Sequence, residues 1–404
     1  MKEEYPKGIQ LTPLDDAWRE NPYPILKRVQ DEAPVYYDDQ FGRYIVSRHD
    51  DVASIVKNRN YWVDGRKGNP GTFPQLLMDL TEEPMMIAMD DPDHKRLRNL
   101  VTKAFSQKAA EAMRGRIREI SEELLDAIGD ETEFDFAQRF AAPFAITVIA
   151  DMMGFTKKED QKHFNEWSDT FMNAIFSVNA TEEQKAAGKV VERNLVELFT
   201  QEIAANRQQL QRGIIGDMVA AQEGNDRLND GEIVRMCILV LIAGNITARD
   251  TLGNGLKAFL KHPEQLQKLR DNPSLMPKAV EEILRYDCPV QSSGRIPNED
   301  TVVSGCPIKK GEYIATSLSA ANHDPRTYPN PTKFDIERED VHHHAFGGGS
   351  HFCLGASLAR VELQEAFAAV FARYKHLEVS DKGEEYVRVP NFRGLCKYWI
   401  KVTK

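Results

Sequence analysis

The chain has 404 residues, of which 41% are hydrophobic and 28% charged, so it can build a large core and is not an intrinsically disordered chain. Its formal net charge of −10, with no block of basic residues, argues against nucleic acid or an anionic membrane surface as a partner. Five scattered cysteines without a Cys-x-x-Cys pair argue against a disulfide framework or a zinc ribbon, and they indicate a reducing compartment.

The first 93 residues combine a short helix, a hairpin and a long loop. A helix is predicted over 24–32. Two β-rich segments follow, 35–37 and 44–46, and the turn residues between them indicate a β-hairpin. The segment 58–93 is rich in Gly, Pro and Met and is predicted as a long loop, and loops of this length in compact proteins usually serve function.

Helical patterns dominate from residue 92 to residue 286, because apolar residues recur there every three to four positions. One helix is predicted to begin near Asp93. A long helix opens at Asp230 and is stopped by Pro263. Further helices are predicted over 121–128, 141–153, 158–176, 186–206 and 276–286.

The character of the sequence changes after residue 287. Strands are predicted over 301–303, 313–315 and 387–389, and one more helix over about 355–374. No linker divides the chain. We therefore expect a single domain over 1–404, mainly α with a minor β-sheet region, in which 1–60 and 287–404 contribute most strands and 92–286 are mostly helical.

The most specific motif is Phe-Gly-Gly-Gly-Ser-His-Phe-Cys-Leu-Gly at 346–355, directly before the last predicted helix. A cysteine at a helix N-terminus has its thiolate stabilised by the helix dipole and by free backbone N–H groups. The glycines let the backbone press against a flat ligand, Phe346 can shield the sulfur, and His351 can bind an anion. The alternative interpretation is a tight glycine turn around a buried structural cysteine.

This segment resembles the haem-ligand loop of the cytochrome P450 family, the haem-thiolate monooxygenases, whose pattern is F-x-x-G-x-H-x-C-x-G. The resemblance implies the cytochrome P450 fold, haem b (iron protoporphyrin IX) as the cofactor, and Cys353 as the axial ligand of the iron. It also implies that Phe346, Gly348 and Gly355 contact the haem. A thiolate ligand donates electron density to the iron and favours O–O cleavage, which explains the choice of cysteine.

Two further groups match family positions. His94, Arg98, Arg295 and His351 match the residues that bind the haem propionates, and His94 and Arg98 project from one helix face because they are four residues apart. Glu282 and Arg285 form the family's E-x-x-R pair, with Arg338 as its third member. The resemblance gives that triad a structural role, which is to hold the cysteine loop.

The segment 241–248 resembles the family's oxygen-binding helix. The resemblance implies that Gly244 leaves room for O2 and that Thr247 donates a hydrogen bond to the bound oxygen, with Asn245 beside them. Thr247 can also donate to a carbonyl one turn back, as helix threonines commonly do.

The same helix departs from the family pattern, because Ile246 occupies the place of the usual acid and cannot relay protons. Asn245, Asp250 or ordered water are candidates to replace the acid. The departure also leaves open a peroxide-driven or nitric-oxide-reductase-like activity on the same scaffold. An alternative of another class is a non-catalytic haem-binding sensor.

The residues expected to contact the substrate are mostly apolar, which favours a small or medium hydrophobic molecule. Apolar residues at helical spacing belong more often to the core than to a pocket. By family position, the substrate-contacting residues are Leu77, Ile87, Phe171, Ile175, Leu241, Ile242, Ile246, Val290 and Phe392.

The expected partners follow from the same resemblance. They are O2, the hydrophobic substrate, and a separate ferredoxin or flavodoxin with an NAD(P)H-dependent reductase, since the chain has no room for a flavin domain. The longest strongly apolar run, 237–244, is much shorter than the roughly 20 residues of a membrane span, and the acidic start is typical of neither a signal nor a transit peptide. We therefore expect a cytoplasmic protein that binds neither nucleic acid nor membrane.

Overall fold

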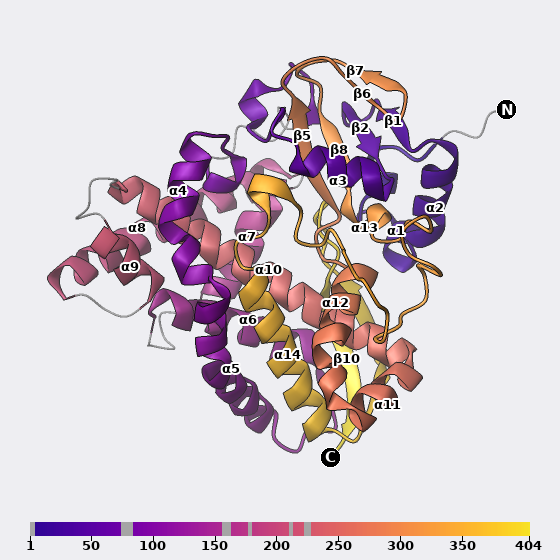
Figure 1. The fold of residues 1–404 in the computed structure, drawn as a ribbon. Coiled ribbons are helices and arrows are strands. Elements are labelled where there is room, and N and C mark those ends of the chain that lie inside the picture. The colour runs from indigo at the N-terminus through magenta and orange to yellow at the C-terminus, as the bar shows by residue number, and fades with distance from the viewer. Residues whose placement is uncertain (1–4, 74–83, 156–162, 177–179, 210–212, 222–227) are drawn as a thin grey trace. The chain divides into compact units, whose positions relative to one another are not determined.

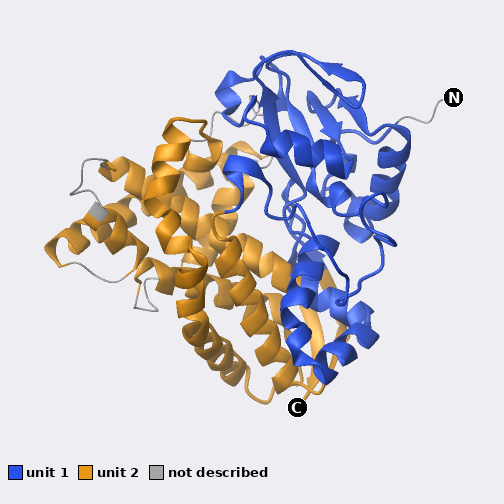
Figure 2. Ribbon diagram, viewed as in Figure 1, with its two compact units in different colours: residues 1–81, 254–353, 385–396 blue, residues 82–253, 354–384, 397–404 orange. Residues whose placement is uncertain are grey.

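The computed structural model describes residues 5–73, 84–155, 163–176, 180–209, 213–221 and 228–404. These residues fall into two compact units, shown in different colours in Figure 2. Unit 1 comprises residues 1–81, 254–353 and 385–396, and unit 2 comprises residues 82–253, 354–384 and 397–404. Each unit is assembled from segments that are far apart in the sequence, so long-range contacts hold both together.

Unit 1 contains a five-stranded sheet in the order β1-β2-β8-β5-β3 (Figure 1). The predicted hairpin is confirmed, because β1 and β2 pair antiparallel with Val35 opposite Val46. Strand β2 pairs parallel with β8, and β5 pairs antiparallel with both β8 and β3. The strands are β1 (Val35–Asp38), β2 (Arg43–Val46), β3 (Tyr61–Trp62), β5 (Ser292–Pro297) and β8 (Ile314–Ser317).

The helix α3 (His49–Lys57) covers one face of this sheet. Val52 and Ile55 of α3 are fully buried and belong to the same core cluster as Val46 and Ile314 of the sheet. Unit 1 also contains a second β-hairpin and several helices. These elements are β6 (Thr301–Val303), β7 (Cys306–Ile308), α1 (Asp16–Glu20), α2 (Tyr23–Glu32), α11 (Pro263–Asp271), α12 (Met276–Tyr286) and α13 (Leu318–Ala321).

The strand predicted over 387–389 is wrong. Residues 387–389 have no regular structure, and the strands on either side are β9 (His376–Tyr386) and β10 (Leu395–Thr403). The amide of Phe392 donates to the carbonyl of Val389 at 3.1 Å and closes a turn around Pro390, which has no N–H to give to a sheet.

Unit 2 is mainly helical, as the apolar spacing predicts. The described α-helices that lie wholly within unit 2 are α4 (Asp93–Val101), α5 (Gln107–Ile128), α6 (Ala142–Met153), α7 (Phe164–Phe176), α8 (Glu182–Gln208), α9 (Ile214–Ala221) and α14 (Ala356–Arg373). The short strand β4 (Glu133–Asp135) pairs antiparallel with β10, which in turn neighbours β9.

The longest helix, α10 (Asp230–Lys261), runs from unit 2 into unit 1. Its end agrees with the prediction, since Pro263 begins the next helix at a position where its missing N–H costs nothing. Among the described helices, α10 is the one long and apolar enough to cross a membrane by length and composition. Of its most apolar window, 61% is buried inside the protein, which is the pattern of a core helix.

Helices α5 and α14 pack along each other in unit 2. Arg114 and Arg118 of α5 both bind Glu365 of α14, with N···O distances of 2.6 and 2.8 Å. One turn earlier, Glu362 is 3% exposed, and no ion pair or hydrogen bond joins its carboxyl to another described residue. Burial therefore raises the pKa of Glu362 to about 8.

This carboxyl makes the stability of the protein depend on pH. A folded-state pKa above the unfolded value means that the contribution of Glu362 is fully present below about pH 4.5 and is lost as the pH rises through 8. Wild type is expected to lose on the order of 2–4 kcal/mol relative to Glu362→Gln over this range. Thermal unfolding of both proteins from pH 5 to pH 9 measures the difference, and the same substitution at the exposed Glu378 is the control. A constant difference across this range would contradict the prediction.

Candidate functional site

Residues 346–353 of the cysteine loop belong to unit 1, and the loop is folded by its own backbone hydrogen bonds. The amide of Cys353 donates to the carbonyl of Phe346 at 2.9 Å, and the amide of Gly347 donates to the carbonyl of His344 at 2.8 Å. A short 3₁₀ turn, Gly349–His351, precedes the cysteine. Of the five cysteines, all of them described, Cys353 alone is exposed. The alternative interpretation of a buried structural cysteine is therefore wrong.

Two of the loop glycines lie against the last turn of α3. A Cβ on Gly348 would approach Val56 Cγ2 to 2.6 Å. A Cβ on Gly349 would approach the carbonyl oxygen of Val56 to 2.5 Å, and Gly349 also has a positive φ of 65°. The loop therefore favours glycine at both positions, because the Val56 side chain lies against Gly348 and the backbone of α3 lies against Gly349. A Cβ on Gly355 would meet nothing within 4 Å.

Arg295 reaches the same turn of α3. It lies on β5, is 4% exposed, and its Nη2 donates to the carbonyl of Val56 at 3.4 Å. Its Nη1 donates to the Ser293 hydroxyl at 2.9 Å and to the carbonyl of Gly294 at 2.7 Å. The structure thus brings a buried cation and the cysteine loop together at the end of α3. Sequence position gave no sign of α3 as their common support.

Aromatic rings flank the loop. Phe346 is nearly buried and its ring lies 6.0 Å from that of Phe352, edge to face. Phe352, within the loop, is itself 41% exposed. His351 is half-buried on the 3₁₀ turn between them.

The predicted triad is formed by direct contacts. Both guanidinium nitrogens Nε and Nη2 of Arg285 bind the Glu282 carboxylate, at 2.7 and 2.8 Å, and both side chains are fully buried. Arg338 Nε adds a third charged contact, 3.2 Å from Glu282 Oε2. A bidentate pair of this kind fixes the direction of both side chains.

The triad binds the main chain of the segment that precedes the cysteine loop. Arg285 donates to the carbonyls of Asn322, Pro331 and Lys333, at 2.9, 2.8 and 3.2 Å. The Asn322 side chain then accepts from the amide of His344 at 2.7 Å, and the His344 carbonyl accepts from Gly347. Three consecutive hydrogen bonds therefore join Arg285 to the first glycine of the loop. Sequence analysis missed Asn322 because nothing in its neighbourhood distinguishes it from any loop asparagine.

The segment 241–248, which is expected to bind oxygen, lies on the part of α10 that belongs to unit 2. The Thr247 hydroxyl donates to the carbonyl of Ala243 at 2.7 Å, as the alternative interpretation expected, and the residue is partly exposed. A Cβ on Gly244 would approach Ile149 Cδ1 to 2.7 Å, so this glycine allows α6 and α10 to pack closely. Ile246 is 4% exposed. The face of α10 that carries Ala243 and Thr247 is thus its least buried face in this segment.

Asn245 points away from that face. It is fully buried, and its Nδ2 donates to Asn165 Oδ1 of α7 at 3.1 Å. One turn further along, Arg249 Nη1 binds Asp169 Oδ1 of α7 at 2.7 Å. Asn245 and Arg249 therefore face α7 as a pair, which sequence analysis did not foresee because their partners are 80 residues away.

His94 and Arg98 share one face of α4 in unit 2, as their spacing predicts. His94 is 2% exposed and lies 3.5 Å from Asp91, measured from Nδ1 to Oδ1. Burial lowers the pKa of His94, and the nearby Arg98 adds to the effect while Asp91 opposes it. His94 is therefore a neutral donor or acceptor at neutral pH, whereas Arg98 carries the charge.

The expected pocket residues differ in their surroundings. Leu77 lies outside the described residues, and Ile87 is 58% exposed. The others in unit 2 are buried or half-buried: Phe171, Ile175, Leu241, Ile242 and Ile246. In unit 1, Val290 and Phe392 face each other as an isolated antiparallel bridge.

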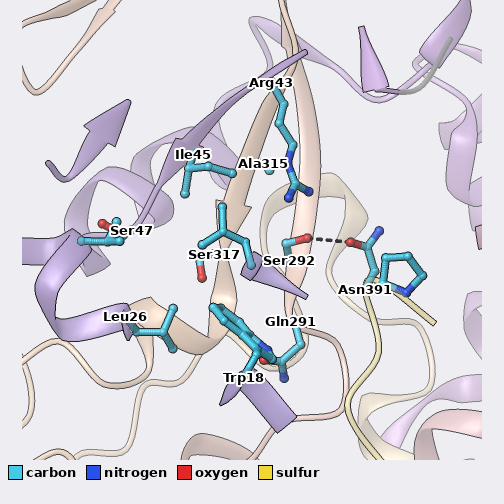
Figure 3. Close-up of a pocket in the computed structure, with 13 residues that line it drawn as sticks. Trp18, Leu26, Arg43, Ile45, Ser47, Gln291, Ser292, Ala315, Ser317 and Asn391 are labelled. Atoms are coloured by element: carbon cyan, nitrogen blue, oxygen red, sulfur yellow. Dashed lines mark hydrogen bonds between the residues drawn. The ribbon is translucent and has the colours of Figure 1, made fainter. Parts of the chain in front are cut away.

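A small cavity of about 30 Å³ lies beside this bridge in unit 1 (Figure 3). Ser292 donates to Asn391 Oδ1 at 3.2 Å at its wall. Trp18 and Gln291 also line it, and neither Trp18 Nε1 nor Gln291 Oε1 has a hydrogen-bond partner among the described residues. A cavity of this size, with one free donor and one free acceptor, suits one or two buried water molecules.

Comparison with known proteins gives consistent results. The family model for cytochrome P450 matches residues 41–387. Cytochrome P450 CYP107DY1 of Priestia megaterium is 36% identical over 370 residues, which cover 88% of this chain and 89% of that protein.

Solved structures are similar over nearly the whole chain. P450BioI in complex with hexadec-9Z-enoic acid ligated acyl carrier protein has a TM-score of 0.88 and 31% identity, covering 96% of this chain and 100% of its own. Myxobacterial cytochrome P450 CYP267B1 in complex with myristic acid has a TM-score of 0.90 and 30% identity, covering 97% of this chain and 99% of its own.

Proposed function

Because the chain belongs to the cytochrome P450 family, whose members bind haem b and act as monooxygenases, we propose that it transfers one oxygen atom of O2 to a small or medium hydrophobic substrate. The reaction is a hydroxylation or an epoxidation, with Cys353 as the axial ligand of the haem iron. The observation that carries the proposal is the exposed Cys353 in a glycine turn that packs on α3.

The residues of unit 1 fit haem bound through a thiolate. Cys237 and Cys288 are unsuited as ligands, since both are fully buried and burial raises the pKa of both thiols, to about 12 for Cys288. Cys353 is instead exposed, and its backbone N–H donates a hydrogen bond to the carbonyl of Phe346. Bound haem supplies the iron that activates O2, and a thiolate ligand favours O–O cleavage.

The propionates of the haem need donors or cations. Arg295 and His351, from β5 and the 3₁₀ turn, and His94 and Arg98, from α4, take this role in our proposal. The buried Arg295 already has its guanidinium held by three protein oxygens, so its direction is set before any ligand binds. Phe346, Gly348 and Gly355 complete the proposed haem contacts, and the triad of Glu282, Arg285 and Arg338 holds the loop.

Thr247 is the proposed hydrogen-bonding residue on the oxygen side, with Gly244 and Asn245 shaping the helix around it. Its hydroxyl can turn from Ala243 to a ligand, because a hydroxyl has one proton and two acceptor sites. Thr247→Ala is expected to lower product formed per NADH by about 10-fold and to divert the electrons to hydrogen peroxide.

Thr247→Ser is the matched control for this prediction and is expected to keep most of the coupling, since it keeps the hydroxyl. Product and peroxide are measured together with NADH consumption. If the alanine variant and wild type form equal amounts of product per NADH consumed, Thr247 has no role in the reaction.

The proposed partners are a ferredoxin or flavodoxin with an NAD(P)H-dependent reductase, in the cytoplasm. The proposed substrate-contacting residues are Leu77, Ile87, Phe171, Ile175, Leu241, Ile242, Ile246, Val290 and Phe392. They are apolar throughout, and the relatives crystallised with myristic acid, with an acyl carrier protein bearing a fatty acid and with testosterone support a hydrophobic substrate.

The test is reconstitution with a surrogate ferredoxin, its reductase and NADH. A panel of hydrophobic compounds, including myristic acid, is first screened for a spin-state change of the haem, and each compound that binds is then assayed for an oxygenated product. Product that depends on NADH and O2 supports monooxygenation. The buried Ile246 motivates the alternatives: far better turnover with hydrogen peroxide alone identifies a peroxide-driven enzyme, and binding without any product identifies a sensor.

A further inference from the structure

The charged and polar residues that follow Thr247 on α10 form an arrangement that packing alone does not explain. Asp250 is fully buried. Its Oδ1 accepts from Arg249 Nε at 3.1 Å, whereas its Oδ2 has no hydrogen-bond partner among the described residues. A buried carboxylate oxygen without a donor is costly, so such an atom calls for an explanation such as bound water.

Two more buried atoms on α10 and α7 lack partners in the described part of the chain. They are Asn245 Oδ1 and the Ser168 hydroxyl, and both residues are fully buried. Asn245 comes one turn before Arg249 on the side of α10 that binds α7. Unsatisfied acceptors therefore lie on both sides of Ile246 and Thr247 in the sequence of the helix, which indicates water held along this stretch.

Asp250 is well placed with respect to Thr247. Three residues along an α-helix bring a side chain back to within about 60° of the same direction, at a rise of about 4.5 Å. Ile246 is the immediate neighbour of Thr247, but its side chain is apolar and carries no proton. Thr251 does not compete for Asp250, since its hydroxyl donates to the carbonyl of Thr247 at 2.7 Å.

The carboxyl of Asp250 is also linked to the surface. Arg249, 3% exposed, binds Asp250 on one side and Asp169 on the other. The side chain of Asp169 is 48% exposed, so this edge of α7 meets solvent. Burial raises the pKa of Asp250 to about 6, against the opposing effect of Arg249 and with a smaller contribution from Asp169. A group with such a pKa exchanges protons readily near neutral pH.

We propose that Asp250 passes protons, through water bound at its free Oδ2, to the face of α10 that carries Thr247, while Arg249 holds the carboxyl in place and passes no proton itself. The carboxylic acid gives its proton to the bound water, that water gives one of its own toward Thr247, and the carboxylate regains a proton from solvent through the same bound water at Oδ2. No electron moves in these steps. The relay rests on the proposed function, since it supplies the protons that oxygen transfer consumes, and it replaces the acid that Ile246 excludes.

The first test is kinetic and uses the holoenzyme with the substrate found in the screen above. Asp250→Asn is expected to lower NADH-driven product formation at least 10-fold. Turnover driven by hydrogen peroxide is expected to stay within 2-fold of wild type, because the peroxide brings its own protons. Asp250→Glu keeps a carboxyl and is expected to restore most of the NADH-driven rate.

Glu232→Gln is the control on the same helix. Glu232 is paired with Arg96, and its position about 22 Å along the helix from Thr247 is too distant for a relay. This variant is expected to match wild type by both routes. Equal NADH-driven rates in Asp250→Asn and wild type would overturn the proposal, and so would an equal loss by both routes, which identifies a structural ion pair.

The second test needs no turnover. The infrared difference spectrum between wild type and Asp250→Asn, both with haem bound, is expected to contain one carboxylic acid C=O band that disappears with a midpoint near pH 6. A difference spectrum without a titrating band between pH 5 and pH 7 would overturn the proposal. If wild type forms no product by any route, the proposed function fails, and the infrared titration still decides whether Asp250 holds an exchangeable proton.

Discussion

Replacing Cys353 with histidine is expected to give a protein that binds haem but has lost the thiolate-type spectrum of the reduced carbonyl complex. Product formation is expected to fall by about 100-fold or more, since an imidazole donates less electron density to the iron than a thiolate does. The spectrum of the reduced, carbonyl-bound protein and the yield of oxygenated product measure the two effects.

Cys306→Ser is the matched control for this substitution. Cys306 is a half-buried cysteine on the hairpin of β6 and β7, outside the proposed site, and its loss is expected to change neither the spectrum nor the product yield. A thiolate-type spectrum that persists in Cys353→His would mean that another sulfur binds the iron.

Replacing Arg285 with methionine is expected to destabilise unit 1 by about 3–5 kcal/mol, because it leaves the buried Glu282 without its bidentate partner. The carbonyls of Asn322, Pro331 and Lys333 lose their donor at the same time. The expected result is a lower midpoint of urea unfolding together with loss of haem at a lower urea concentration than in wild type.

The control for this loss is an exposed pair of the same charge type. Lys309 Nζ lies 2.7 Å from Asp300 Oδ2, and the two side chains are 71% and 61% exposed. Lys309→Met is therefore expected to change the free energy of unfolding by less than about 1 kcal/mol. If Arg285→Met unfolds and releases haem at the same urea concentrations as Lys309→Met, the triad does not hold the loop.

Much of the helical architecture could be predicted from the sequence. The helix over 276–286 has the predicted bounds because Pro277 stands at its start and its apolar residues keep a strict spacing. The beginning of α4 at Asp93 and the end of α10 before Pro263 are marked by residues that act locally. The predicted strand over 387–389 failed because the turn at Pro390 outweighs the β-branched residues around it.

The site is less predictable, since its parts depend on contacts between distant segments. The loop motif identified Cys353, but it did not reveal that Gly348 packs against the Val56 side chain and Gly349 against the backbone of α3. Likewise, Gly244 stands opposite Ile149, a contact that spacing along α10 does not encode. The sequence also does not reveal the ion pair between Arg249 and Asp169, because only the packing of α7 on α10 brings these two residues together.

The bonds that Arg285 and Arg338 make to carbonyl groups have an evolutionary consequence. All of the acceptors are main-chain carbonyl oxygens, and they belong to Asn322, Pro329, Asn330, Pro331 and Lys333. Side chains at most of these positions are therefore free to drift without disturbing the anchor. The length of the segment is not free in the same way, because inserting or deleting one residue between 329 and 333 would displace the acceptors on one side of the change relative to those on the other. We therefore expect this stretch to vary in sequence among related chains while its residue count stays fixed.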